Sequence, residues 1–251
     1  MSEQFLSAIR HVGRTAALAG DTIRFTLRPP LGFDLLMAQL HHLGVRSLSI
    51  TNITALFTGM VLALQTAHTL GIYGAKLLIG DAVSISIVRE LGPVLTSLLV
   101  AGRVGAGITA EIGSMAVTEQ VDAIRAMGAS PIKKLVVPKV LATLIMLPIL
   151  TVLADFVGIF GGLIISVKEL NQTSHYYIQH VVTALTFDDI FSGVGKTFFF
   201  AGFISIVGCY NGLNATGGAD GVGRATTTTV VVASILILIS NFFLTKLFML
   251  F

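Results

Sequence analysis

Five long stretches of this sequence are almost wholly apolar, and each is long enough to cross a membrane as a helix. A membrane-spanning helix needs about 20 mainly apolar residues. The five stretches cover residues 50–70, 82–108, 135–167, 197–213 and 226–251. Because the connections between them are short, the pattern predicts an all-α polytopic membrane protein with a single domain over residues 1–251.

A different pattern occupies residues 1–30. Apolar residues recur there at steps of three and four, and arginines recur on a neighbouring face at positions 10, 14, 24 and 28. This periodicity predicts an amphipathic helix, which Pro29 and Pro30 end. We expect it to lie in the headgroup layer with its arginines toward lipid phosphate. Packing against the protein's own spans is the alternative, and both arrangements can hold together.

Residues 118–128 predict a short helix between the second and third spans. Thr118 can cap its start, and Gly128 can take the left-handed position at its end. Its apolar residues fall on one face: Val121, Ile124 and Met127. A helix of about ten residues is marginal alone in water, so it needs a surface to dock on. That surface belongs either to a partner or to the underside of its own membrane domain.

The composition and the charge pattern agree with a membrane protein and give it an orientation. The chain is 54% hydrophobic and only 12% charged, whereas soluble domains carry about 25% charged residues. Lysine and arginine gather before the first span, between the second and third, and before the fifth. Such loops face the cytoplasm. The other side has fewer, including Lys196, and acids such as Asp189 dilute them. We therefore expect the N-terminus in the cytoplasm and the C-terminus outside.

Four segments carry a resemblance to known permeases. DAIRAMGASPIKKLVVP, residues 122–138, resembles the coupling loop of ABC transporter permeases, with Asp122 where the importer pattern usually has Glu. Three further segments closely resemble the MlaE/YrbE family, the permeases of MCE-type ABC lipid transporters: residues 57–65, 89–128 and 217–231. The similarity extends over nearly the whole chain, including the N-terminal helix and the five spans.

The resemblance implies a homodimeric permease in a bacterial inner membrane, with its C-terminus in the periplasm. It would move phospholipid between that membrane and a periplasmic MCE protein, and so maintain outer-membrane lipid asymmetry. The implied partners are an ABC ATPase subunit like MlaF, a hexameric MCE protein like MlaD and often a STAS-domain protein like MlaB. ATP would be bound by the ATPase, so we expect no cofactor and no metal in this chain, and no nucleic-acid partner. The residues expected to couple the short helix to the ATPase are Glu119, Asp122, Ile124, Arg125, Met127 and Gly128.

Two adjacent charges, Arg89 and Glu90, lie inside the second span. A charge at the bilayer centre costs about 2.5–3.5 kcal/mol on insertion scales. Consecutive side chains diverge on a helix, so each charge needs another partner or water. Pro93 has no N–H and leaves the carbonyl of Arg89 without its helical partner, which loosens the helix at the charged pair. The sequence therefore predicts a polar environment beside this segment.

We expect that environment to be the lip of a cavity at the dimer interface, among spans one, two and five. Arg89 would hold a lipid phosphate there while acyl chains lie against Leu62, Leu64 or their neighbours. Glu90 would either orient the counterpart of Arg89 across the dimer or release the lipid by repulsion. Arg224, near the start of the last span, is a second residue that could meet lipid phosphate. The alternative is that Arg89 and Glu90 only fix helix packing through hydrogen bonds and never meet substrate.

Other features of the sequence are weaker evidence for functions other than lipid transport. GVGKT, residues 193–197, resembles the end of a nucleotide-binding loop, but Ile190 stands where the first glycine is required. Asp155, inside the third span, could relay protons, although a hydrogen bond to a nearby Thr or Ser is the expectation. An intramembrane lipid-modifying enzyme remains the alternative function; it would need converging nucleophiles, bases or metal ligands in the spans. A membrane scaffold would leave the buried charges without a role.

Overall fold

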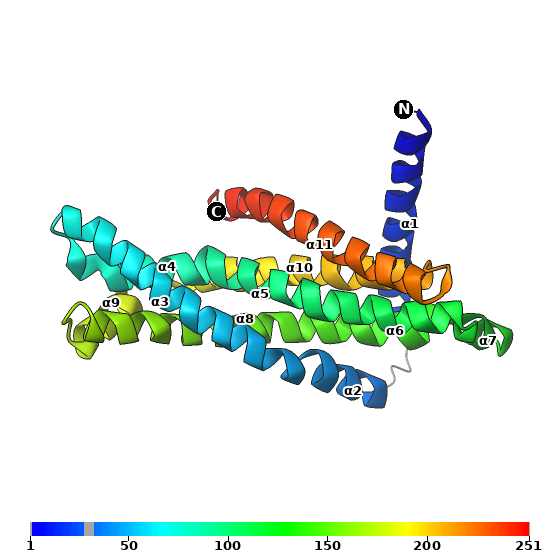
Figure 1. The fold of residues 1–251 in the computed structure, drawn as a ribbon, viewed down its shortest axis with the longest axis horizontal. Helices are drawn as coiled ribbons and strands as arrows, with labels where there is room; N and C mark the ends of the chain where they lie inside the picture. Colours follow the sequence, from blue (N-terminus) through cyan, green and yellow to red (C-terminus); the bar gives the residue numbers. More distant parts are fainter. Residues whose placement is uncertain (1, 28–32, 251) are drawn as a thin grey trace. The chain divides into compact units, whose positions relative to one another are not determined.

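The computed structural model describes residues 2–27 and 33–250, and within these ranges the chain is helical without a strand (Figure 1). Among the described residues, five helical segments are long and apolar enough to cross a membrane: Phe33–Ile72, Ile79–Val117, Ile132–Lys168, Phe187–Leu213 and Gly218–Phe248. A further helix precedes them at the N-terminus. The all-α polytopic fold predicted from the apolar stretches is therefore confirmed.

The helices are bounded as follows: α1 Ser2–Thr26, α2 Phe33–Leu43, α3 Leu48–Ile72, α4 Ile79–Ser86, α5 Gly92–Val100, α6 Ala106–Val117, α7 Gln120–Ala126, α8 Val137–Lys168, α9 Ser174–Ala184, α10 Phe187–Leu213 and α11 Gly218–Phe248. Three π-helical turns, in which the backbone hydrogen bonds reach back five residues, lie within the second and third spans: Ile87–Leu91, Ala101–Gly105 and Ile132–Val136. The contacts of the chain group these elements into two compact units.

Unit 1 comprises residues 1–45, 100–145 and 201–236. Its helix α1 contacts the π-helical turn Ile132–Val136 and crosses the direction of α6 steeply (Figure 1). Leu18 and Thr22 of α1 are buried, and His11 Nδ1 lies 2.9 Å from the Tyr210 hydroxyl. The predicted N-terminal helix is thus confirmed as a helix that packs on its own unit. Its predicted end at the Pro-Pro pair lies outside the described residues.

Unit 2 comprises residues 46–99, 146–200 and 237–251. Its core is a cluster from α3, α4, α8, α9 and the π-helical turn Ile87–Leu91: Ala63, Ala67, Ile79, Val83, Ile87, Ile165, Tyr177 and Val181. Glycines bring α3 and α8 close together, because a Cβ at Gly59 would overlap the Gly158 carbonyl oxygen and a Cβ at Gly161 would overlap that of Leu56. Small residues allow membrane helices to approach in this way.

One span begins earlier than the apolar stretch predicts. The stretch starts at residue 197, but α10 starts at Phe187 and includes Asp189 and Lys196. The charge pattern predicts that both residues lie in an outer loop, and this prediction is wrong. Both are almost completely buried, with 3% of Asp189 and 0% of Lys196 exposed. A helix can hold such charges among apolar residues when each has an ion-pair partner.

Candidate functional site

The polar centre of unit 2 begins at the π-helical turn Ile87–Leu91. The Gly92 N–H donates to the carbonyl of Ile87, five residues back. Pro93 follows this turn and has no N–H to donate to a carbonyl of the preceding turn. Lys196 Nζ donates to the Arg89 carbonyl oxygen at 3.0 Å. The π-helical turn confirms the expectation that the helix is loosened here, and a lysine from α10 donates to a carbonyl within it.

Glu90 has three side-chain partners from two helices. Lys196 Nζ and the Thr245 hydroxyl donate to its Oε1 at 2.7 and 2.8 Å, and Asn241 Nδ2 donates to Oε2 at 2.9 Å. Lys196 Nζ also donates to Thr245 Oγ1 at 2.7 Å. A lysine ammonium has three donors, and all three are used by Arg89 O, Glu90 and Thr245. The result is a closed polar network that joins the second span to α10 and α11 within unit 2.

Arg89 pairs with a different residue. Its Nε forms an ion pair with Asp189 Oδ1. The other carboxylate oxygen of Asp189 accepts from the Thr186 backbone N–H at 2.9 Å and from the Thr186 hydroxyl at 2.8 Å. The prediction that Arg89 and Glu90 each need a partner other than one another is therefore confirmed. Their side chains remain 43% and 37% exposed, respectively.

The four partners of this pair were missed in the sequence: Asp189, Lys196, Asn241 and Thr245. One available signal was the spacing of Asp189 and Lys196. Residues seven apart lie on one face of a helix. On this face Asp189 can pair with Arg89, and Lys196 can pair with Glu90. Counting both residues as loop charges concealed the match.

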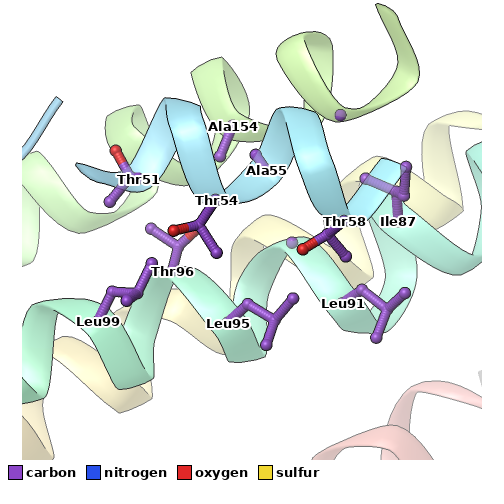
Figure 2. A pocket seen from close by; sticks show the side chains of 12 residues that line it. Thr51, Thr54, Ala55, Thr58, Ile87, Leu91, Leu95, Thr96, Leu99 and Ala154 are labelled. Atoms are coloured by element: carbon purple, nitrogen blue, oxygen red, sulfur yellow. The ribbon is translucent and has the colours of Figure 1, made fainter. Parts of the chain in front are cut away.

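The expected acyl-chain residues do not lie around the small pocket that unit 2 contains. Leu62 is half-buried and packs against the core cluster, whereas Leu64 is 45% exposed. The pocket lies between α3 and α5, where threonine hydroxyls meet leucine side chains (Figure 2). Its lining includes Thr54, Thr58 and Thr96 but neither of the charged residues.

This pocket has space for water rather than for lipid. The volume open to the centre of a water molecule is about 20 Å³. One buried water needs about 10–15 Å³ by that measure. Nearby, Asp155 is only 7% exposed, and its Oδ1 has no hydrogen-bond partner in the described part of the chain. The expected hydrogen bond from a Thr or Ser is therefore not made to this oxygen, which abuts Gly92 instead.

The short helix that the sequence predicts is present in unit 1 but starts later. Helix α7 begins at Gln120, preceded by Glu119 in the left-handed region with φ 60°. Thr118 does not cap it, because its hydroxyl donates to the Ser114 carbonyl of the preceding helix at 2.8 Å. The capping prediction is wrong for this reason. The prediction for Gly128 is confirmed: it has φ 75°.

The hydrogen bonds after α7 close its C-terminus. Gly128 N–H donates to the Arg125 carbonyl at 2.9 Å, and Ala129 N–H donates to the Ile124 carbonyl at 3.1 Å. This pair of bonds forms a Schellman motif, which satisfies carbonyls at a helix end. The motif fixes where the chain turns after α7.

The predicted apolar face of α7 is divided between the interior and the surface. Val121 and Ile124 are 4% and 7% exposed, so they pack within unit 1, whereas Met127 is 72% exposed. The side chains of Glu119, Asp122 and Arg125 are also exposed, and the last two form a pair at 2.8 Å. The surface available to a partner is therefore Met127 with the surrounding charges.

Arg224, the second candidate for lipid phosphate, is exposed in the first turns of α11 in unit 1. It borders a shallow depression with Asp220, Thr227 and Thr228. Its carbonyl accepts the Thr228 hydroxyl at 2.9 Å. The depression is formed by one stretch of one helix.

Comparison with known proteins gives these features a context. A family model described as Permease MlaE matches residues 36–247. A probable ABC transporter permease protein from Rickettsia bellii is 45% identical over 237 residues, which cover 94% of this chain and 92% of that protein. The intermembrane phospholipid transport system permease protein MlaE of Haemophilus influenzae is 35% identical over 247 residues, which cover 98% of this chain and 94% of that protein. In Arabidopsis thaliana, the chloroplastic protein trigalactosyldiacylglycerol 1 is 34% identical over 92% of this chain and 66% of its own length. The five spans and the extent of these matches together show that the chain belongs to the MlaE family of ABC transporter permeases.

Proposed function

We propose that this permease transports phospholipid between a bacterial inner membrane and a periplasmic MCE protein. The observation that carries the proposal is the match to the Haemophilus phospholipid permease along almost the full length of both chains. In this function the protein contributes to outer-membrane lipid asymmetry, and a homodimer forms the path for the lipid. The pocket between α3 and α5 accommodates about one water, so we place the cavity for a diacyl lipid between two copies of the chain.

The proposed source of energy is an ABC ATPase that docks on α7. Met127 offers an exposed apolar side chain, and charged residues of both signs surround it. The burial of Val121 and Ile124 ties α7 to its own unit, so a force on the helix would reach the rest of that unit. The other proposed partners are a hexameric MCE protein and a STAS-domain protein.

The test is reconstitution with an ABC ATPase subunit like MlaF, followed by measurement of labelled phospholipid moving toward and away from the membrane. ATP-dependent lipid movement in either direction supports the proposal. If the complex assembles and hydrolyses ATP but no lipid moves, the cargo is wrong. Lipid turnover by the purified permease without a partner would instead favour the intramembrane enzyme.

Docking on α7 predicts that Met127→Asp weakens ATPase association while the permease stays folded. The reason is that the substitution places a carboxylate at the centre of the apolar contact. Copurification and lipid-stimulated ATP hydrolysis measure the effect. Thr183→Asp, an exposed substitution on α9, is the matched control and should retain both. Equal retention by the two variants would show that the ATPase docks elsewhere.

The proposed lipid contact at Arg89 predicts a crosslink. A photoreactive residue at position 89 should label phospholipid, and Arg89→Ala should slow lipid transfer because a phosphate loses its cationic partner. Thr54, in the small pocket, provides a control position for the photoreactive residue. If position 89 gives no lipid adduct and Arg89→Ala transports normally, the role of Arg89 is confined to its pairing with Asp189.

A further inference from the structure

Helix α9 (Ser174–Ala184) has three distinct faces. Tyr177 and Val181 are 1% and 9% exposed and belong to the core cluster of unit 2. The next residue in each case is apolar but exposed, with 49% for Ile178 and 70% for Val182. Successive helical residues are rotated by about 100°, so these two form an adjacent face. The polar residues that follow each of them, at positions 179 and 183, are exposed and form the third face.

We propose that α9 lies in the headgroup layer of the membrane, with Ile178 and Val182 in the lipid and Gln179 and Thr183 in water. The proposal rests on the membrane-spanning assignment of the neighbouring helices and not on phospholipid as the transported cargo. A helix with a core face, a lipid face and a water face in this order fits a membrane boundary, since each face meets a different medium.

The chain holds α9 at such a boundary. Only Leu185 and Thr186 separate it from α10, which is long and apolar enough to span the membrane. Phe187 and Phe191, in the first turns of α10, are 90% and 72% exposed. The exposed apolar residues of α9 are therefore followed directly in the chain by exposed apolar residues of a span. This continuity indicates lipid as the occupant of the α9 surface.

Specific contacts fix the rotation of α9 about its axis. His180 Nδ1 lies 2.9 Å from Asp81 Oδ1 of α4, and the Tyr177 hydroxyl donates to the Ile159 carbonyl of α8 at 3.3 Å. Gly80 permits the close approach, since a Cβ there would lie 3.0 Å from the Tyr177 carbonyl oxygen. Because α9 is held from two sides, it cannot turn its apolar face toward the core.

The charge of α9 distinguishes it from α1. Residues 174–184 contain no Asp, Glu, Lys or Arg, whereas α1 carries arginines at positions 10, 14 and 24. Membrane binding by an amphipathic helix has an apolar part and an electrostatic part that depends on anionic lipid. We therefore expect the immersion of α9 to be independent of anionic lipid and of salt.

The experiment uses tryptophan as a reporter, because the chain contains none. Single tryptophans are placed at Ile178 and Val182 and, as matched controls on the same helix, at Gln179 and Thr183. The full-length protein is reconstituted in phosphatidylethanolamine vesicles with and without phosphatidylglycerol. Quenching is measured with lipids brominated near the headgroup and with aqueous iodide. Phe191→Trp provides a reference position inside a span.

The expected result is several-fold stronger quenching by brominated lipid at 178 and 182 than at 179 and 183, with the reverse order for iodide. Phosphatidylglycerol should leave the lipid contrast unchanged. Strong iodide quenching at all four positions would overturn the proposal, because the whole helix would then lie in water. Protection of 178 and 182 from both quenchers would also overturn it and would indicate that a protein, either a partner or a second copy, covers this face.

Discussion

Replacing Lys196 with Met should destabilise the protein more than any other lysine substitution near the site. Lys196 is 0% exposed and donates three hydrogen bonds, to Arg89 O, Glu90 Oε1 and Thr245 Oγ1. Methionine preserves the apolar stem but removes all three donors. The Arg89 carbonyl then loses the Lys196 donor, and Glu90 loses its cation.

The magnitude follows from these contacts. Interhelical hydrogen bonds in membranes contribute about 0.6 kcal/mol on average and at most about 1.7, so three average bonds give about 2 kcal/mol. Removing one partner of a fully buried ion pair costs about 3–5 kcal/mol. Glu90 is 37% exposed and keeps Asn241 and Thr245, which places Lys196→Met near the lower of these estimates. We expect a loss of about 2–3 kcal/mol.

The assay is equilibrium unfolding in mixed micelles with increasing dodecyl sulfate, with the folded fraction measured by pulse proteolysis. The double variant Lys196→Met with Glu90→Gln removes both charges and should recover at least about 1 kcal/mol relative to the sum of the two single losses. Lys246→Met changes an exposed lysine and should stay within about 0.5 kcal/mol of the native protein. Additivity of the two single losses within about 0.5 kcal/mol would refute the network as an energetic unit.

Two further predictions concern packing and lipid. Gly161→Ala should cost about 1–3 kcal/mol of unfolding free energy in the same assay, because its Cβ would overlap a backbone carbonyl of α3. Gly107→Ala is the control and should change the stability little, because its Cβ would meet nothing within 4 Å. Equal losses in the two variants would contradict the close approach of α3 and α8 as the cause. Neutralising Arg10, Arg14 and Arg24 together should speed hydrogen exchange in α1, most strongly in anionic vesicles at low salt, since each arginine near an anionic surface contributes about 1 kcal/mol. Unchanged exchange, or an equal change in neutral lipid, would show that packing alone holds α1.

The five spans were predictable because length and apolar composition decide whether a helix can cross a membrane, and both are local properties of the sequence. The ends of the spans were less predictable. The start of α10 depends on Asp189 and Lys196, and their place in the helix depends on partners about one hundred residues away along the chain. No window of local hydropathy contains that information.

The same distinction applies to α7. Gly128 could be identified because a left-handed residue at a helix end is a local requirement that glycine meets best. The start of the helix could not, because Thr118 has a competing acceptor in the preceding turn of α6. The burial of Ile124 but not of Met127 follows from tertiary packing, which periodicity alone does not give.

The two adjacent charges of the second span, Arg89 and Glu90, differ in how many of their hydrogen-bonding atoms are already used by partners. Glu90 accepts hydrogen bonds at both carboxylate oxygens, from Lys196, Thr245 and Asn241. Arg89 uses Nε for Asp189, and within the described residues the structure shows no hydrogen bond from its two terminal nitrogens. A guanidinium has five N–H donors and binds phosphate through two of them at once. Helix packing therefore accounts for Glu90 but not for the outer edge of Arg89. A substitution at Glu90 consequently tests the packing of the span. A substitution at Arg89 changes both its pair with Asp189 and its terminal N–H donors, so the lipid crosslink at position 89 is the test of lipid contact.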